Sequence, residues 1–359
     1  MIRIMNFKEL RINLQSLGVT VPKELSGRTG GAGPSEGQVI IISGQHISVP
    51  TNSWFVKDSP YSIVKKGESF VLTENNDERV EVSFPLKPKC YDLNTDTGIE
   101  IKKIALIHGK DCLASTIYQG CCYFDQGCEC RFCGIELSLK DEKTVKEKKP
   151  EDLGLAALKA KQLDNVSHVT LTMGLRPNSY EGIHHLLECV KSIKDLSSLP
   201  VHVQVCPVDD EQIYETIKQA GADTIGIHVE SCSEEILKNI SPAKAELGID
   251  FYIDAWQKAV SVYGRNQVSS FLIAGIGDNI KGILNSAKLM AELGVYPYVL
   301  PLRPVPGTLL ENYKPPAPDE MIEIYEKVAA VIKSNHLSSK SSKAGCVRCG
   351  ACSSITEFA

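Results

Sequence analysis

The stretch HVTLTMGLRPNSYEGIHHLLECVKSIKDL, residues 168–196, shows the unit that is repeated through most of this chain. Residues 168–173 are a short apolar run of strand length, and residues 181–196 can form a helix. The glycine and the proline between them are typical loop formers. The stretch therefore predicts a strand, a loop and a helix in succession.

The same alternation recurs on both sides of this unit. Strands are expected at residues 104–107 or 114–118, and then at 168–173, 201–206, 224–229, 268–274 and 296–302. Helices are expected at 150–164, 181–196, 210–220, 233–239 with 251–263, 279–293 and 319–334. Such alternation predicts right-handed βαβ units around a parallel sheet, either a partial barrel or an open doubly wound sheet. In both folds the active site lies at the carboxyl ends of the strands.

The first hundred residues follow a different pattern. A helix is expected at residues 7–17, and strands at 39–42, 46–49, 62–64, 69–73 and 80–84. The glycine-rich residues 27–35 lack the Gly-Lys-Ser/Thr ending of a phosphate loop, which favours a lid or a docking loop. We predict a β-rich N-terminal region at residues 1–105, a barrel at 106–336 and a cysteine-rich C-terminal tail at 337–359.

Composition excludes several classes of protein. The 359 residues carry a net charge of −5 with a pI near 6.0, which argues against a general binder of nucleic acids or membrane surfaces. Apolar runs are shorter than the ~20 residues that span a bilayer, and no secretory signal pattern is found. A cytoplasmic protein is expected, in which thirteen reduced cysteines bind metal rather than form disulfides.

Five of these cysteines fall within residues 121–133. Thiolates at such spacing can converge on one soft metal centre, and an iron–sulfur cluster is the favoured occupant. A structural zinc ion usually takes four ligands, often from two CxxC halves, and no second half lies nearby. Zinc or a disulfide pair are the alternatives. Because the segment follows the first predicted strand, it is expected at the rim of the sheet.

The stretch CRFC at residues 130–133 resembles the second half of the radical S-adenosylmethionine (SAM) signature, CxxxCxxC with an aromatic residue before the last cysteine. The sequence departs from that signature in its first spacing, because seven residues separate Cys122 from Cys130. The resemblance implies a partial (β/α)6 barrel of the TIM type in which Cys122, Cys130 and Cys133 hold a [4Fe–4S] cluster. Cys128 is the main alternative to Cys122, and Cys121 is a weaker one.

Segments after the later strands extend the resemblance to the biotin-synthase-like branch. Residues 172–174 stand where that family binds the methionine amino group, and residues 228–231 resemble its ribose-binding segment. Residues 274–278 resemble the segment near the adenine, and residues 301–309 the ending of the sixth strand. The resemblance implies SAM-binding roles for Phe132, Thr172, Gly174, His228, Glu230, Gly275, Gly277 and Leu302.

A narrower resemblance runs almost from end to end. Residues 28–35, 108–114 and 344–352 are similar to the uncharacterised radical SAM proteins encoded in bacterial nitrilase gene clusters. That gene context suggests a role in nitrile or cyanide nitrogen metabolism. The resemblance does not supply a substrate.

Three further cysteines, Cys346, Cys349 and Cys352, recur at three-residue intervals near the C-terminus. They resemble the ferredoxin-type run but lack its fourth cysteine and following proline. An auxiliary iron–sulfur cluster is favoured, and a zinc site or a redox-active tail are the alternatives. A fourth ligand could come from Cys112 or from the substrate.

These features predict a radical SAM enzyme. Three thiolates leave one iron of the cluster free, and the resemblance implies that SAM chelates that iron. One electron then cleaves SAM to a 5′-deoxyadenosyl radical, which abstracts hydrogen from a small-molecule substrate. The expected partners are that substrate and a reductant such as flavodoxin or ferredoxin, with no nucleic acid and no membrane. The alternative class is a non-catalytic iron–sulfur or zinc protein that serves as an electron carrier or scaffold.

Overall fold

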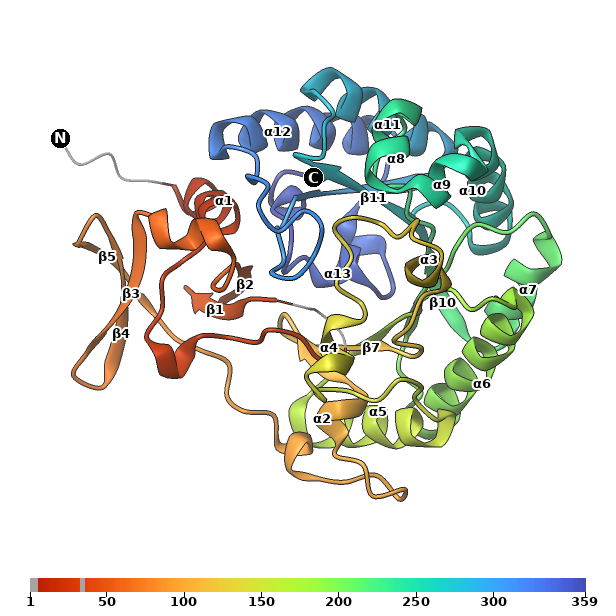
Figure 1. The fold of residues 1–359 in the computed structure, drawn as a ribbon, viewed down its shortest axis with the longest axis horizontal. Coiled ribbons are helices and arrows are strands. Elements are labelled where there is room, and N and C mark those ends of the chain that lie inside the picture. Colours follow the sequence, from red (N-terminus) through yellow and green to blue (C-terminus); the bar gives the residue numbers. More distant parts are fainter. Residues whose placement is uncertain (1–5, 33–35) are drawn as a thin grey trace.

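The computed structural model describes residues 6–32 and 36–359. Gly33, Pro34 and Ser35, the end of the glycine-rich stretch, lie outside the described residues. The described part divides into a β-rich N-terminal region and a larger ring of helices around a sheet (Figure 1). Within it, no helix is both long enough and apolar enough to cross a membrane.

The sheet of the large unit has seven strands in the order β12–β11–β10–β9–β8–β7–β6. Their bounds are β6 (Leu106–His108), β7 (Cys112–Thr116), β8 (His168–Thr172), β9 (Val201–Gln204), β10 (Ala222–Gly226), β11 (Val268–Ala274) and β12 (Val295–Pro301). Strands β7 to β12 are parallel and adjacent in chain order, whereas β6 pairs antiparallel with β7. The sheet is therefore an open half-barrel, which confirms the predicted partial (β/α)6 barrel and sets aside the doubly wound sheet.

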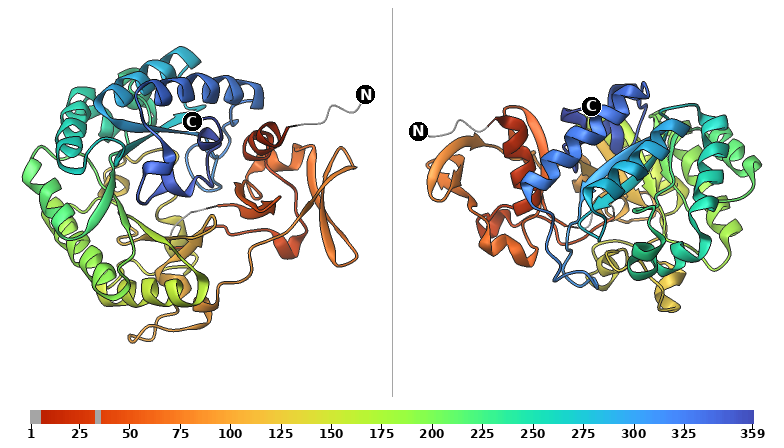
Figure 2. Two further views of the ribbon diagram at one scale, coloured as in Figure 1. Left: turned by 180° about the vertical axis from the view of Figure 1, so that it is seen from behind. Right: turned by 90° about the horizontal axis from the view of Figure 1, so that it is seen from above.

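Helices surround this half-barrel on its outer side (Figures 1 and 2). Their bounds are α5 (Pro150–Asp164), α6 (Ser179–Ser197), α7 (Glu211–Gln219), α8 (Glu234–Ile240), α9 (Pro242–Leu247), α10 (Ile249–Tyr263), α11 (Ile280–Leu293) and α12 (Pro318–Ser334). Proline at the first helical position begins α5, α9 and α12, where its missing N–H costs no hydrogen bond. The main hydrophobic core lies between these helices and the sheet, with Trp256 fully buried.

The N-terminal region is built as predicted, with small shifts. Its elements are α1 (Phe7–Leu17), the hairpin β1 (Gln38–Ile42) and β2 (Gln45–Val49), and the antiparallel sheet β3 (Tyr61–Lys66), β4 (Ser69–Glu74) and β5 (Asp77–Val82). Strand β5 begins earlier than expected because Asn75 and Asn76 form a tight turn with φ of 52° and 71°. A second, smaller core lies between α1 and these strands.

Short helices complete the chain: α2 (Ile101–Ile104), α3 (Cys122–Asp125), α4 (Leu137–Lys140) and α13 (Cys346–Cys349), with 3₁₀ turns at Lys23–Leu25, Trp54–Asp58, Lys89–Asp92, Ser339–Ser341 and Ile355–Glu357. Helix α13 lies inside the ring rather than on it (Figure 1). Its segment is held there from both units. The N–H of Gly345 donates to His168 of β8 (3.3 Å), and Gln15 of α1 donates to the carbonyl of Ala351 (3.0 Å).

Candidate active site

A cavity of about 190 Å³ opens at the carboxyl ends of β8, β9 and β10. Three thiols line it, those of Cys121, Cys130 and Cys133. Five of the predicted SAM-binding residues line the same cavity: Phe132, Thr172, Gly174, His228 and Glu230. The structure therefore gathers the cysteine loop and the ends of the middle strands at one place, where the sequence analysis expected the active site.

Cys121, and not Cys122, belongs to this group. Cys121 precedes α3 in an extended conformation, with φ of −148°, and its thiol lines the cavity. Cys122 begins the helix, is 7% exposed, lies outside the cavity wall and donates its N–H to Leu175 (2.8 Å). Cys128 also lies outside the cavity, with its thiol directed to the side-chain oxygen of Gln126 (3.6 Å). The geometry favours the candidate that the sequence analysis ranked last.

The cysteine loop lies directly on the end of β8, and Gly174 makes this approach possible. A Cβ atom at Gly174 would stand 1.7 Å from the carbonyl oxygen of Gly120, a backbone clash that no side chain could relieve. The N–H of Gly174 donates to Tyr118 (2.9 Å). Glycine is therefore required at residue 174 by close backbone contact with the loop.

The buried Lys148 supports the same loop through Gln119. Gln119 donates to the carbonyl of Ile135, two residues after Cys133 (2.8 Å), and accepts from the ammonium group of Lys148 (2.9 Å). Lys148 is fully buried, and this burial lowers its pKa to about 7. Its second hydrogen bond goes to the carbonyl of Val145 (2.7 Å). The segment after the third thiol is thus tied to a partly uncharged lysine.

Glu230 forms an ion pair that the sequence analysis did not anticipate. Its carboxylate accepts from Lys244 of α9 at 2.5 Å, and Lys244 also donates to the carbonyl of His228 (2.7 Å). Burial alone would lower the pKa of Lys244, but Glu230 raises it well above its usual value. Lys244 was missed because α9 is too short to show a helical period. Pro242, at its first position, was the only signal in the sequence.

The backbone at Glu230 and the ring of His228 are both held in unusual settings. Glu230 has φ of 68°, a left-handed conformation that is strained for a side chain of this kind. His228 stacks on Phe271 with ring centroids 3.7 Å apart, and its Nδ1 accepts from the N–H of Phe271 (3.2 Å). Burial lowers the pKa of His228 well below its usual value, so the ring is neutral. Its proton is therefore on Nε2, a buried donor with no partner among the described residues.

The remaining predicted SAM-binding residues lie next to the cavity and not in its wall. Leu302 is 3% exposed and belongs to an apolar cluster with Ile276 and Leu310, against which Phe132 packs. Gly275 and Gly277 have φ of 96° and 134° in the turn after β11. Their predicted place near the adenine remains a prediction.

A second cavity, of about 240 Å³, lies deeper in the half-barrel. Its wall contains the tail thiols Cys346, Cys349 and Cys352 together with Cys112 of β7 and His108 of β6. Thr172 and Gln204 line both cavities. The tail cysteines therefore lie inside the half-barrel, next to the cavity that the cysteine loop covers.

Neither group of thiols is arranged for a single metal ion. Within residues 6–32 and 36–359, no three His, Cys, Asp or Glu side chains converge as they would around one ion. A cluster binds each thiolate through a different iron atom, and its ligands therefore stand farther apart than those of one ion. Burial raises the pKa of Cys133 to about 12, so that this thiol would lose its proton only on binding metal.

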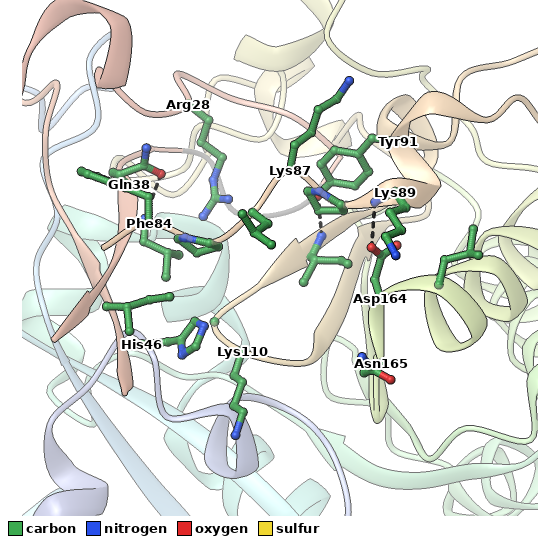
Figure 3. Close-up of a pocket in the computed structure, with 18 residues that line it drawn as sticks. Arg28, Gln38, His46, Phe84, Lys87, Lys89, Tyr91, Lys110, Asp164 and Asn165 are labelled. Carbon is green, nitrogen blue, oxygen red and sulfur yellow. Dashed lines mark hydrogen bonds between the residues drawn. The ribbon is translucent and has the colours of Figure 1, made fainter. Parts of the chain in front are cut away.

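A third cavity, of about 600 Å³, lies between the two units of the molecule (Figure 3). The cationic side chains Arg28, Lys87, Lys89 and Lys110 line it, together with His46, whose pKa is lowered by burial. Asp164 is the acidic residue among those that line it, and its carboxylate accepts from the backbone N–H groups of Lys89 (2.7 Å) and Cys90 (3.0 Å). This basic cleft is positive on a chain whose net charge is −5.

Residues 116–290, just under half of the chain, match the model of the Radical SAM superfamily. Over 136 residues the chain is 28% identical to bacteriochlorophyllide c C-7(1)-hydroxylase from Chlorobaculum limnaeum, an alignment that covers 37% of this chain and 34% of the hydroxylase. The matched part thus spans about a third of that relative's length.

Solved structures align with the chain over a larger part of its length. Methylornithine synthase aligns with a TM-score of 0.49 and 17% identity over 68% of this chain and 72% of its own. The [FeFe]-hydrogenase maturase HydG from Carboxydothermus hydrogenoformans aligns with a TM-score of 0.49 and 17% identity over 65% of this chain and 54% of its own. The match over residues 116–290 supports a radical SAM enzyme, whose reaction on its substrate is unknown.

Proposed function

We propose that Cys121, Cys130 and Cys133 hold a [4Fe–4S] cluster whose fourth iron binds SAM in the cavity of about 190 Å³. The observation that carries this proposal is the presence of these three thiols, and of neither Cys122 nor Cys128, in one cavity wall. When bound, the two groups supply one-electron cleavage of SAM to methionine and a 5′-deoxyadenosyl radical that removes hydrogen from a substrate. The protein supplies orientation and excludes water.

The residues around the cavity divide the recognition of SAM between them. Gly174 leaves the end of β8 open for the methionine part, and Thr172 offers a hydroxyl there. The unpartnered Nε2–H of His228 is a donor for a carbonyl or hydroxyl oxygen. Lys244 fixes the carboxylate of Glu230 as an acceptor for ribose hydroxyls. Phe132 provides an apolar surface for the adenine.

The substrate site is the part of the deeper cavity, of about 240 Å³ in all, that a cluster on its thiols would leave free. This volume lies below the range of roughly 300–1,000 Å³ that drug-sized ligands occupy, which favours a small-molecule substrate. Its wall is mostly apolar, with polar groups from Thr170 and Gln204. The likeness to proteins of nitrilase gene clusters supports a substrate from nitrile or cyanide nitrogen metabolism.

A second iron–sulfur cluster on Cys346, Cys349 and Cys352 is the other part of this proposal. The three thiols line one cavity in the interior, and side chains already direct donors to two of them. Gln204 donates to Cys346 (3.5 Å), and His108 lies 2.9 Å from Cys352. Such donors are typical partners of cluster sulfur atoms.

The reductant, a flavodoxin or a ferredoxin, would meet the enzyme at the basic cleft. The turn between β6 and β7 separates the cleft from the tail thiols, since Gly109 lines the cleft and a Cβ atom there would stand 2.7 Å from the sulfur of Cys349. The basic side chains would attract an acidic carrier to this position.

All thirteen cysteines lie in the described part and are free thiols, which suits the reducing cytoplasm.

The test is anaerobic reconstitution, followed by iron and sulfide analysis and by assay of 5′-deoxyadenosine after addition of dithionite and SAM. We expect 5′-deoxyadenosine from the wild type, at least about a hundredfold less from Cys121→Ala, and near wild-type yield from the matched control Cys122→Ala. Retained cleavage in Cys121→Ala with loss in Cys122→Ala or Cys128→Ala would assign the ligand to that other residue. Protein that carries clusters and never cleaves SAM would contradict the proposed function.

A further inference from the structure

Four thiols, and not three, meet in the deeper cavity. Cys112 begins β7, is 2% exposed and lines the cavity beside Cys346, Cys349 and Cys352. Its thiol shares the cavity wall with that of Cys349, and the hydroxyl of Thr170 lies 3.3 Å from it.

We propose that Cys112 is the fourth ligand of the tail cluster, which makes this centre a [4Fe–4S] cluster held by four protein thiolates. The inference deepens the proposed function, because it rests on the presence of a cluster at Cys346, Cys349 and Cys352. It does not depend on the identity of the ligands in the cysteine loop. Cys112 is remote in sequence from the tail, and the fold alone brings it there.

His108 is the competing ligand, and its hydrogen bonds exclude it. Nδ1 of His108 lies 3.1 Å from Nη2 of Arg28, and Nε2 lies 2.9 Å from the sulfur of Cys352. A guanidinium group has only donors, so Nδ1 must accept, and the proton of a neutral ring is then on Nε2. Nε2–H therefore donates to the sulfur of Cys352 and has no free lone pair for iron. His108 is a positioning residue for the cluster and not a ligand.

The β6–β7 hairpin presents both residues to the tail. His108 and Cys112 are opposite each other in the antiparallel pair, so their side chains project from the same face. Gly109, with φ of 62°, forms the turn between them, and only glycine leaves room for the sulfur of Cys349 at this point. The hairpin therefore presents one thiol, from Cys112, and one N–H donor, from His108, to the cysteine tail.

The consequence is a division of labour between the two clusters. Three thiolates in the cysteine loop leave one iron open for SAM, whereas four thiolates at the tail leave none open. A cluster without an open iron cannot anchor the substrate, and its role is electron transfer. The part of the deeper cavity that the cluster leaves free then binds substrate through Thr170, Gln204 and its apolar wall, and not through iron.

The test uses the full-length chain with Cys130→Ala and Cys133→Ala, in which only the tail cluster can form. After anaerobic reconstitution, iron and sulfide are counted and the dithionite-reduced protein is examined by electron paramagnetic resonance (EPR). We expect about four irons and four sulfides per chain. Adding Cys112→Ala should lower the iron by at least about a quarter or replace the four-iron signal with that of a three-iron cluster. The matched control is Cys189→Ala, a buried cysteine of α6, which should leave both unchanged.

Two further variants keep the result decisive. Cys112→Ser preserves the size of the side chain and its contact with Thr170, so this variant should fold normally. An altered EPR spectrum of the folded serine variant supports the assignment even if the alanine variant misfolds. His108→Ala should keep full iron and lower the reduction potential, because a donor to cluster sulfur is lost.

An unchanged spectrum and iron content in Cys112→Ser, or loss of iron in His108→Ala alone, would overturn the inference. If the double variant binds no iron and sulfide, or only zinc, the tail cluster itself is wrong. Cleavage of SAM by the wild type reports on the loop cluster separately.

Discussion

The cysteine loop and the cysteine tail gather their thiols by opposite routes. The loop collects three thiols from residues 121–133, a single short segment. The tail site collects its groups from residues 28, 108–112 and 346–352, which only the finished fold brings together. A local motif leaves room for a ligand and can be read from spacing. Spacing does not reveal a site that distant segments assemble.

The largest expected effect is on iron content and SAM cleavage. A matched pair of glycine substitutions tests the two cysteine sites separately. Gly174→Ala places a Cβ atom 1.7 Å from the carbonyl of Gly120 and should displace the cysteine loop. Gly345→Ala, at φ of 90°, places one 2.5 Å from the ring of His202 and should displace the tail. Each variant should lose about half of the bound iron, and only Gly174→Ala should abolish SAM cleavage outright with dithionite as reductant.

Iron analysis and the 5′-deoxyadenosine assay check this pair. If either substitution removed all the iron, the two sites would not be independent. The comparison between a local site and an assembled site would then fail.

A smaller effect is expected from Glu230→Gln in the loop site. The substitution removes the carboxylate that pairs with Lys244 and that would accept from ribose. A hydrogen bond to a charged group contributes about 1.5–3 kcal/mol, so the KM for SAM should rise by about tenfold or more. Glu234→Gln, on the exposed start of α8, is the control. An unchanged KM in Glu230→Gln would remove Glu230 from the SAM site.

The smallest expected effect is a pH dependence of the free energy of unfolding, caused by Lys148, the buried lysine that supports the cysteine loop. The pKa of Lys148 is about 7 in the folded protein and near 10.5 when unfolded, so between these values the unfolded chain binds more protons. The free energy of unfolding should therefore rise with pH across this window, by up to about 1.4 kcal/mol per pH unit. Below about pH 7 both states are protonated and the slope vanishes.

Urea unfolding of the metal-free protein at about pH 7 and about pH 9 measures this slope. Lys148→Met should flatten it and raise stability at the lower pH, because the buried charge is gone. Lys149→Met, at an exposed neighbour, should change neither. If the free energy of unfolding of Lys148→Met changed with pH as steeply as that of the wild type, the pH dependence would come from other groups.

Most of the fold could be predicted from the sequence because it is periodic. Residues 150–164 and 268–274 were expected as a helix and a strand and are found with the same bounds as α5 and β11. The β6–β7 hairpin was anticipated only as two alternatives for one strand. The short helix α9 was missed, and with it Lys244, because six residues carry no readable period.

The part of the site that comes from one short segment could be predicted from the sequence. The part that depends on the direction in which a side chain points could not. Spacing alone could not distinguish Cys121 from Cys122, since the choice depends on which of the two begins α3. The tail cysteines were recognised as a group, but their place inside the half-barrel was not. The contacts of Arg28 and His108 with that group depend on packing between segments that no local pattern connects.

The hydrogen bonds that join α1 to the tail also set an order of events during synthesis. Arg11 donates to the carbonyl of Ser353 (3.2 Å), and Gln15 to that of Ala351 (3.0 Å), so the N-terminal helix stays without these partners until a ribosome has passed residue 353. The cysteine loop and its strands emerge far earlier. The thiols of residues 121–133 are therefore synthesised well before the segment that carries the tail thiols can dock on α1, and the two proposed clusters would form in that order.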